Sequence, residues 1–313
     1  MERLTKFISS RGLAKLCDSR NVVVRSGFSE IDYDLLERHR PGGSIYLCTD
    51  AILTFIDHLL SKVQDDFVLV TGDSDTAITD VAIHHRVLSP LVNSPYLRAW
   101  YAQNSLAKHP KLYQMPIGMD YHTMWQRPGV WGMLGQSPIA QENALIGILG
   151  KSQPFRSRHF VGYCNWHLAG DRGDRVACMQ KIQKDMCYVE SNFLPRHTSW
   201  QRQAECMFVI SPEGVGVDCH RTWEALLLGC VPVVKRSQFS SIFDGLPVVV
   251  LDDWDQFNYA HMSLFVSPLL SNRFNFSTLF TAHWMDRIRD KPPLRLDDMT
   301  LDEFRSFVCG ASY

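Results

Sequence analysis

The residues with the clearest capacity for chemistry lie in the segment 211–235. There an apolar run is followed by Gly214 and Gly216, and then by Arg221 and Glu224, three residues apart. Glycines let the backbone approach a ligand closely, and residues three apart share one face of a helix. The segment therefore predicts a glycine loop and a helix that could bind an anion at its first turn.

Each polar residue of this predicted helix has a possible role. A helix N-terminus offers free N–H groups and the positive end of a dipole to a diphosphate, and Asp218 is the predicted N-cap. The guanidinium of Arg221 can hold a phosphate through two hydrogen bonds. The carboxylate of Glu224 could accept hydrogen bonds from ribose hydroxyls, and Lys235 could add positive charge at the end of the next strand.

Ordinary structural roles compete with these interpretations. Arg221 and Glu224 could form a surface ion pair, His220 could be structural, and Trp223 and residues 226–228 suit a core. The order of the parts favours a ligand site. Glycines, arginine, acid, a helix-ending Gly229 and an apolar strand follow one another where such a site would need them.

The rest of the chain alternates apolar runs with helical patterns, which is typical of an α/β fold with a largely parallel sheet. The predicted strands are residues 44–48, 67–71, 97–101, 111–117, 158–164, 207–211, 231–235 and 247–251. The predicted helices are residues 51–63, 79–91, 174–186, 200–206, 219–229, 257–269 and 276–289, and residues 141–151 could be a helix or a linker. The length of 313 residues favours two domains, which we divide near residue 140 into 1–140 and 141–313.

The composition excludes several classes of protein. A formal net charge of −1 gives no global attraction to nucleic acid or anionic membranes. No apolar stretch is long enough for a transmembrane helix, and the first 25 residues lack the apolar middle of a signal peptide. The nine cysteines are odd in number and include no CxxC pair, which favours reduced thiols over disulfides or a zinc site. We expect a soluble cytoplasmic protein, or a lumenal domain without its anchor.

The segment 211–235 resembles the donor-binding motif of exostosin-like glycosyltransferases, which reads P-x-G, then S-x-R-x-x-D/E-A, then G-C-I/V-P-V. The matching residues are Pro212, Gly214, Arg221, Glu224, Ala225, Gly229, Cys230, Val231, Pro232 and Val233. Cys219 replaces the serine or threonine that is common before the arginine. Segments 100–104, 109–112 and 116–122 also resemble exostosin-like proteins, including those of microbes and large DNA viruses. The Thr-Glu-Lys helix motif of α1,3-fucosyltransferases is not present.

This resemblance implies a GT-B fold, in which two Rossmann-like domains face each other across a cleft. The C-terminal domain would bind a nucleotide-sugar donor, and the N-terminal domain a glycan or glycoconjugate acceptor. The implied reaction transfers a sugar to a glycan hydroxyl without a cofactor beyond the donor and without a metal. A UDP-sugar, such as UDP-xylose or a UDP-hexose, is the favoured donor, and GDP-fucose remains an alternative. Inversion is favoured, because Gly216 stands where retaining enzymes often have a second glutamate.

Such a transfer needs a base for the acceptor hydroxyl and positive charge at the leaving diphosphate. The candidate bases follow two predicted strands, and we rank Asp73 and Asp75 above Asp120 and His122. The sequence Asp73-Ser-Asp75 also matches the metal-binding D-x-D of GT-A enzymes, which we discount beside the Arg221 motif. The candidate donor-binding residues are Arg158, Arg196, Ser211, Glu213, Gly214, Gly216, Asp218, His220, Arg221, Glu224 and Lys235.

Two other classes of function compete. A non-catalytic Rossmann-like module would bind a nucleotide or sugar without turnover. An NAD-dependent enzyme is disfavoured, because the glycine loop lacks G-x-G-x-x-G and no acidic residue closes a following strand at the usual distance.

Overall fold

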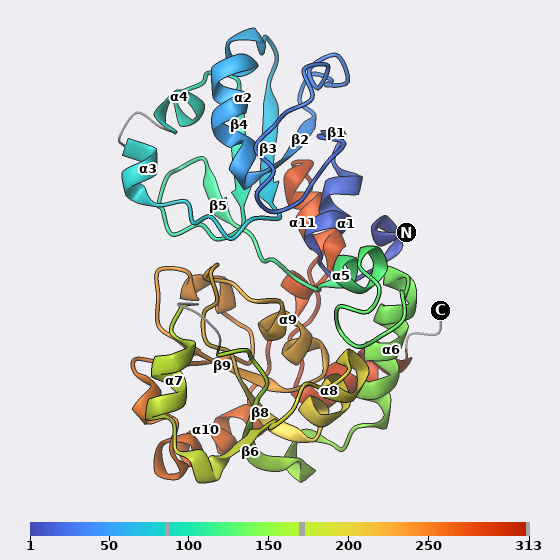
Figure 1. The fold of residues 1–313 in the computed structure, drawn as a ribbon, viewed down its shortest axis with the longest axis vertical. Helices are drawn as coiled ribbons and strands as arrows, with labels where there is room; N and C mark the ends of the chain where they lie inside the picture. Colours follow the sequence, from blue (N-terminus) through green and yellow to red (C-terminus); the bar gives the residue numbers. More distant parts are fainter. Residues whose placement is uncertain (85–87, 169–172, 311–313) are drawn as a thin grey trace.

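The computed structural model describes residues 1–84, 88–168 and 173–310 and arranges them in two halves, each built on a five-stranded sheet (Figure 1). The strands are β1 (Ser19–Arg20), β2 (Ser44–Cys48), β3 (Phe67–Gly72), β4 (Leu97–Ala102), β5 (Leu112–Gln114), β6 (His159–Cys164), β7 (Cys187–Val189), β8 (Cys206–Ile210), β9 (Val231–Lys235) and β10 (Val249–Leu251). Every pair of neighbouring strands within these sheets is parallel.

Helices cover both sheets, as parallel sheets require. They are α1 (Ser10–Leu16), α2 (Ile52–His58), α3 (Asp80–His84), α4 (Ser89–Val92), α5 (Tyr121–Gln126), α6 (Pro138–Lys151), α7 (Arg175–Lys181), α8 (Arg196–Ala204), α9 (His220–Leu227), α10 (Tyr259–Ser271), α11 (Thr281–Ile288) and α12 (Leu301–Gly310). No helix in the described parts of the chain is long and apolar enough to cross a membrane.

The N-terminal sheet has the strand order β1-β2-β3-β4-β5, so its strands follow the chain from one edge to the other. Alternate side chains point to opposite faces. On one face, side chains such as Ile45 and Leu69 pack in a cluster with residues of α2, α3 and α4. On the other face, Tyr46 and Val70 pack in a cluster with residues of α1 and α11.

The C-terminal sheet has the order β10-β9-β8-β6-β7. From β6 the chain builds outward to β7, then returns to the other side of β6 and builds outward again through β8, β9 and β10. The order therefore reverses between β6 and β8. Such a reversal is a topological switch point, and ligands of open α/β sheets bind at the carboxyl ends of the strands beside it.

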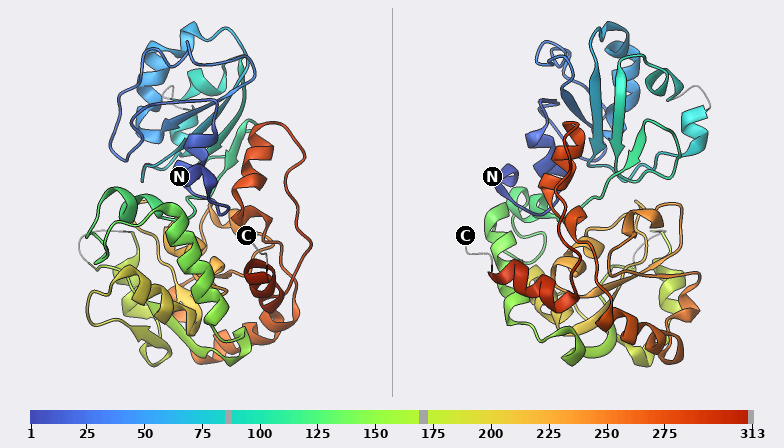
Figure 2. Two further views of the ribbon diagram at one scale, coloured as in Figure 1. Left: turned by 90° about the vertical axis from the view of Figure 1, so that its right-hand side faces the viewer. Right: turned by 180° about the vertical axis from the view of Figure 1, so that it is seen from behind.

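The chain crosses between the halves near both of its ends. The view from behind in Figure 2 shows the segment that contains α11 rising from the C-terminal half alongside the N-terminal sheet. There Trp284, Met285 and Ile288 join the cluster on one face of that sheet. In the opposite direction, Phe7 is buried in the core of the C-terminal half. The division at residue 140 stays a prediction, and the structure adds that α11, which we expected in the second domain, covers the first sheet.

The predicted fold class is confirmed: two parallel α/β halves form a GT-B arrangement with a cleft between them. All eight predicted strands are present, whereas the short strands β1 and β7 were not predicted. The predicted helix 79–91 corresponds to α3 and α4, and its residues 85–87 lie outside the described chain. The predicted helix 174–186 was too long, because α7 ends at Lys181, and α1, α5 and α12 were not predicted.

Candidate functional site

The largest concentration of predicted site residues surrounds a cavity of about 580 Å³ between the two halves. Its C-terminal wall comes from the segments that follow β6, β7 and β8, that is, from the carboxyl ends of the strands beside the switch point. We call it the switch-point cavity. The predicted residues in its lining are Asp75, Asp120, Arg196, Gly214, Gly216, Asp218, His220, Arg221 and Glu224.

The first turn of α9 opens into this cavity without a side-chain cap. The N-cap is Cys219, which has extended backbone angles and whose side chain makes no capping hydrogen bond. The prediction that Asp218 caps the helix was therefore wrong by one residue. Because α9 lacks a side-chain cap, its first amide groups can bind an anion from the cavity.

Arg221 lies in that first turn, beside the uncapped amides. Its guanidinium group lies 5.5 Å from the centre of the Trp166 ring and 3.4 Å from Ser211 Oγ. Both Arg221 and Trp166 line the switch-point cavity. A planar guanidinium stacked on an aromatic ring keeps its edge available for a phosphate.

Glu224 lies one turn further along α9 and is held by two donors. Its carboxylate accepts a hydrogen bond from Arg196 and another, at 3.1 Å, from Trp200 Nε1. The Glu224 side chain is only 5% exposed and the Arg196 side chain 15%. The buried Arg196–Glu224 ion pair therefore lines the cavity, and the Glu224 carboxylate can still accept a hydrogen bond from a ligand hydroxyl.

Asp120 and His122 form a second polar pair at the start of α5. Asp120 caps this helix by accepting a hydrogen bond from Thr123 N, and its Oδ1 lies 3.3 Å from His122 Nδ1. Burial raises the pKa of Asp120, but His122, His220 and Arg196 outweigh it, so that the pKa lies below its usual range. Burial lowers the pKa of His122, and Asp120 opposes this only in part. The imidazole is therefore neutral at neutral pH.

Two tryptophans in the lining carry unsatisfied donors. The Nε1 atoms of Trp131 and Trp166 are buried and have no hydrogen-bond partner within the described residues. Arg196 lies over the Trp131 ring, 5.1 Å from its centre, and the His167 ring is nearly parallel to that of Trp131. A buried N–H without a partner costs free energy, so these groups are suited to donate to a ligand.

A second cavity, of about 610 Å³, adjoins the first on the side of the N-terminal half. The two cavities share Asp75, Ile117 and His220 in their linings. The second is lined by three arginines, Arg11, Arg25 and Arg127, and we call it the arginine cavity. His122 belongs to this lining and to that of no other described cavity.

The two carboxylates that we ranked first as bases differ in their surroundings. Asp73 is buried, and its oxygens accept hydrogen bonds from Arg11 Nε at 3.2 Å and from Tyr46 Oη at 3.0 Å. Asp75 is exposed at the edge between the cavities. Because both oxygens of Asp73 are already engaged, His122 is geometrically better suited to accept a proton.

Asp218 and His220 connect the halves instead of pointing freely at a ligand. Asp218 accepts hydrogen bonds from Ile117 N at 2.7 Å and from Trp223 Nε1 at 2.9 Å. Burial raises its pKa to about 6. His220 Nδ1 lies 2.7 Å from the carbonyl oxygen of Gly118. When Nδ1 donates to that carbonyl, Nε2 is left as an acceptor at the boundary between the cavities.

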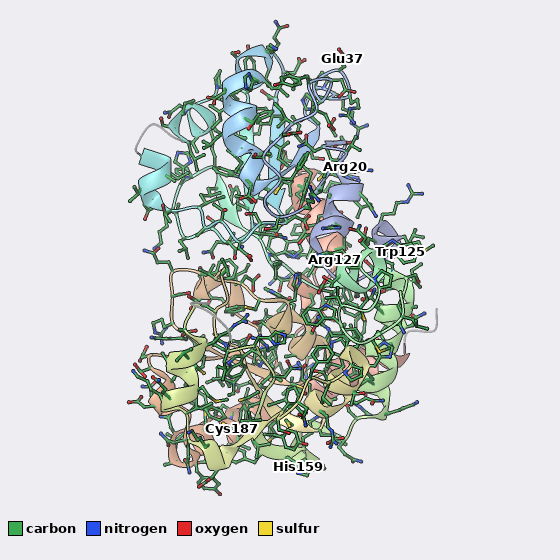
Figure 3. All side chains as sticks on the ribbon, viewed as in Figure 1. Arg20, Glu37, Trp125, Arg127, His159 and Cys187 are labelled. Carbon is green, nitrogen blue, oxygen red and sulfur yellow. The ribbon has the colours of Figure 1, made fainter. Side chains whose placement is uncertain are left out.

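Four predicted site residues lie outside both linings. Ser211, Glu213 and Lys235 follow or end the strands β8 and β9, and the Ser211 hydroxyl bonds to that of Thr222. Arg158 precedes β6 and is buried, with bonds to Gln153, Ser152 and Cys230. Its neighbour His159 marks the far end of the molecule in Figure 3. The expectation for Arg158 was wrong, because the amino ends of parallel strands lie opposite the cleft.

Sequence reasoning missed several residues of the switch-point cavity. Asn165, Trp166 and His167 directly follow β6, so the strand-end rule would have identified them once β6 was placed beside β8. Arg175, in the first turn of α7, lacked a comparable signal. Trp131 lies in a segment rich in glycine and proline that showed no periodicity.

Comparisons with known proteins add little to this geometry. No protein-family model matches the chain, and no curated protein is similar to it in sequence. A solved structure of apo OtsA is similar over 88% of this chain and 74% of its own chain, with 11% sequence identity and a TM-score of 0.37. The fold assignment rests on the strand order and the cleft described above.

Proposed function

We propose that the protein is a glycosyltransferase that moves a sugar from a nucleotide-sugar to an acceptor hydroxyl. The donor binds in the switch-point cavity and the acceptor in the arginine cavity. The observation that carries the proposal is the combination at α9: uncapped first amides and Arg221, with Glu224 one turn further in the same cavity. This combination suits a diphosphate joined to a ribose.

The donor is held by groups of different chemistry. The amides at the start of α9 and the guanidinium of Arg221 neutralise the diphosphate, and the glycine loop lets the backbone approach it. The carboxylate of Glu224 accepts hydrogen bonds from the ribose hydroxyls. A UDP-sugar is our first choice of donor, because the matching residues resemble the exostosin-like motif, and GDP-fucose is the alternative.

His122 acts as the base in this proposal, with Asp120 as its positioning residue. His122 accepts the proton of the acceptor hydroxyl, and the acceptor oxygen forms a bond to the anomeric carbon while the bond to the diphosphate oxygen breaks. The displaced nucleoside diphosphate keeps the electron pair, and Arg221 stabilises its charge. The negative charge of Asp120 stabilises the imidazolium that forms. Attack from the side opposite the leaving group inverts the anomeric configuration.

A metal is not part of the proposed chemistry. The described residues contain no group of three His, Cys, Asp or Glu side chains that could hold a metal ion. The positive charge at the leaving group comes instead from Arg221 and the helix amides. Metal independence stays a prediction, and transfer assays with and without a chelator would test it.

A donor screen with the purified protein tests the proposal. Nucleoside diphosphates are added singly while thermal stability is followed, and nucleotide-sugars are added while release of the diphosphate is measured. We expect one nucleotide class to raise the melting temperature and the corresponding sugar nucleotide to be consumed. Binding without consumption, with and without acceptors, would indicate a binding module, and neither binding nor consumption would contradict the proposal.

A further inference from the structure

We propose that the acceptor is an acidic sugar, which carries a phosphate or carboxylate group that Arg25 and Arg127 bind in the arginine cavity. This inference rests on the proposed function, because it assigns the substrate class of the second cavity. It does not depend on the identity of the donor nucleotide.

The arginine cavity is assembled from separate parts of the chain at the junction of the two halves. The start of α1, residues 25–27 and residues 73–75, which follow β3, come from the N-terminal half, and Ile117 lies between β5 and α5. The remaining lining comes from α5 with its C-cap Arg127 and from His220, and both helices pack against the core of the C-terminal half. A volume of about 610 Å³ is within the range of small-molecule sites and is large enough for a sugar.

The three arginines of this cavity are not equivalent. Arg11 is mostly buried, forms an ion pair with Asp73 and donates a hydrogen bond to Gln126, so its guanidinium is already engaged by the protein. Arg25 and Arg127 are exposed, and neither makes an ion pair with any residue in the described ranges. Figure 3 places Arg127 at the level of the junction between the halves.

The charge of the lining favours an anion. Asp73 is neutralised by Arg11, and the remaining carboxylate, Asp75, lies at the edge shared with the switch-point cavity. Arg25 and Arg127 therefore leave the arginine cavity positive, although the whole chain has a formal net charge of −1. Guanidinium groups bind phosphate and carboxylate through paired hydrogen bonds. An acidic group held at these arginines would keep a sugar over His122, which belongs to the same lining.

The test uses three matched hexosides: a neutral methyl glycoside, its 6-phosphate and its 6-carboxylate. Binding to the full-length protein is measured by calorimetry at low salt without any donor. We expect at least one acidic hexoside to bind about tenfold or more tightly than the neutral one. The double variant R25Q/R127Q should lose this preference, whereas R156Q, which removes an exposed arginine outside both cavities, should keep it.

The two acidic hexosides identify the acidic group, since a preference for one of them assigns phosphate or carboxylate. Equal binding of the neutral and acidic compounds would overturn the inference, as would an acidic preference that survives in R25Q/R127Q. Binding of inorganic phosphate as tight as that of the hexose phosphate would also overturn it, because the sugar would then contribute nothing.

The donor screen separates this inference from the proposed function. Nucleoside-diphosphate release that no acidic hexoside stimulates more than the neutral one would overturn the acceptor assignment and leave the transferase proposal standing. Acidic hexosides that bind through Arg25 and Arg127 in a protein that consumes no nucleotide-sugar would support the anion site and contradict the transferase.

Discussion

The two sheets of this molecule have the same number of strands, all parallel, yet they differ in strand order. The C-terminal sheet reverses its order between β6 and β8, and the segments after these strands diverge and wall the switch-point cavity. The N-terminal sheet keeps its strands in chain order, so it has no switch point of its own. It reaches the arginine cavity through α1 and through the loop segments 25–27 and 73–75.

The difference in strand order suggests that the two cavities have different roles in the proposed reaction. A switch point provides a crevice that a nucleotide can fill, and the C-terminal half contributes Arg221 and Glu224 there. The N-terminal half contributes Arg11 and Arg25 to the arginine cavity, whereas His122 and Arg127 come from α5 and its C-cap, which pack against the core of the C-terminal half. We therefore expect substitutions in the switch-point cavity to weaken donor binding, and substitutions in the arginine cavity to slow transfer after the donor has bound.

The largest expected effect is that of His122→Ala. Loss of a general base lowers kcat by about 10²- to 10⁴-fold, whereas the dissociation constant of the donor should change little. Steady-state rates and calorimetry measure the two quantities. His159→Gln, at the far end of β6, serves as the control, and D75N is the comparison among carboxylates. A slow D75N beside a fully active H122A would transfer the role of base to Asp75.

Arg221→Ala should have the next largest effect, and on the opposite quantity. Without the guanidinium we expect the donor to bind about 10- to 100-fold more weakly, because charge-assisted hydrogen bonds to the diphosphate are lost. Calorimetry with the nucleoside diphosphate measures this change. Arg202→Ala is the matched control, since Arg202 is exposed on α8 and pairs only loosely with Glu205. Donor affinity that is equal in R221A and R202A would remove the basis for assigning the donor to the switch-point cavity.

Glu224→Gln should lower both donor affinity and stability. The substitution removes the nearer of the two buried carboxylates that pair with Arg196 and leaves Asp120 at 3.8 Å, so we expect a loss of about 1–3 kcal/mol in the free energy of unfolding. Chemical denaturation measures it. If Glu224 only anchors Arg196, the variant will lose stability but bind the donor as tightly as the wild type does.

Much of the C-terminal half could be predicted from the sequence, because one contiguous segment carries it. The glycine loop, the helix with Arg221 and Glu224 and the strand β9 follow one another within residues 211–235, so local patterns were enough. The error at Asp218 has a physical reason. Its carboxylate accepts hydrogen bonds from Trp223 Nε1 and from Ile117 N, and no local pattern reveals Ile117, which is 101 positions away in the sequence.

The arginine cavity could not be predicted in the same way. Its lining joins residues that are far apart in the sequence, such as Arg11 and His220, and that come together only in the folded structure. The choice between Asp73 and His122 as the base could not be made from local patterns for the same reason, because it depends on contacts between elements that are far apart in the sequence. Asp73 follows a strand as a base should, but its partners Arg11 and Tyr46 come from other elements. Local patterns also could not show that α11 packs against the N-terminal sheet.

The pH dependence of transfer tests the Asp120–His122 pair. In the proposed mechanism the neutral imidazole of His122 is the active form, and burial holds the pKa of His122 below the ordinary histidine value of about 6.5. The acid limb of kcat/KM should therefore lie below that pH. Asp120 and Asp73 raise the pKa of His122, whereas Arg11 and His220 lower it. The variant D120N removes one of the negative charges that raise the pKa of His122, so the acid limb of this variant should move to lower pH as kcat falls. An unmoved limb would contradict the pairing.

The smallest expected effect concerns the contact between the halves at Gly216. A methyl group there would lie 3.0 Å from Asn104 Nδ2 and 3.2 Å from Asp75 Oδ1, so these side chains must shift. We expect Gly216→Ala to raise the KM for the donor by only a few-fold and to lower stability by about 1 kcal/mol or less. Gly147→Ala is the control, because its methyl group meets nothing within 4 Å in α6 and should stabilise the helix. Improved donor binding in G216A would show that this contact hinders the donor.

A crystal structure of the complex with the nucleoside diphosphate selected by the donor screen tests the central claim most directly. We predict that the diphosphate lies within hydrogen-bond distance of the Arg221 guanidinium and the first amides of α9, with a ribose hydroxyl at Glu224. A nucleotide bound elsewhere, with Arg221 and Glu224 making no contact to it, would contradict the account.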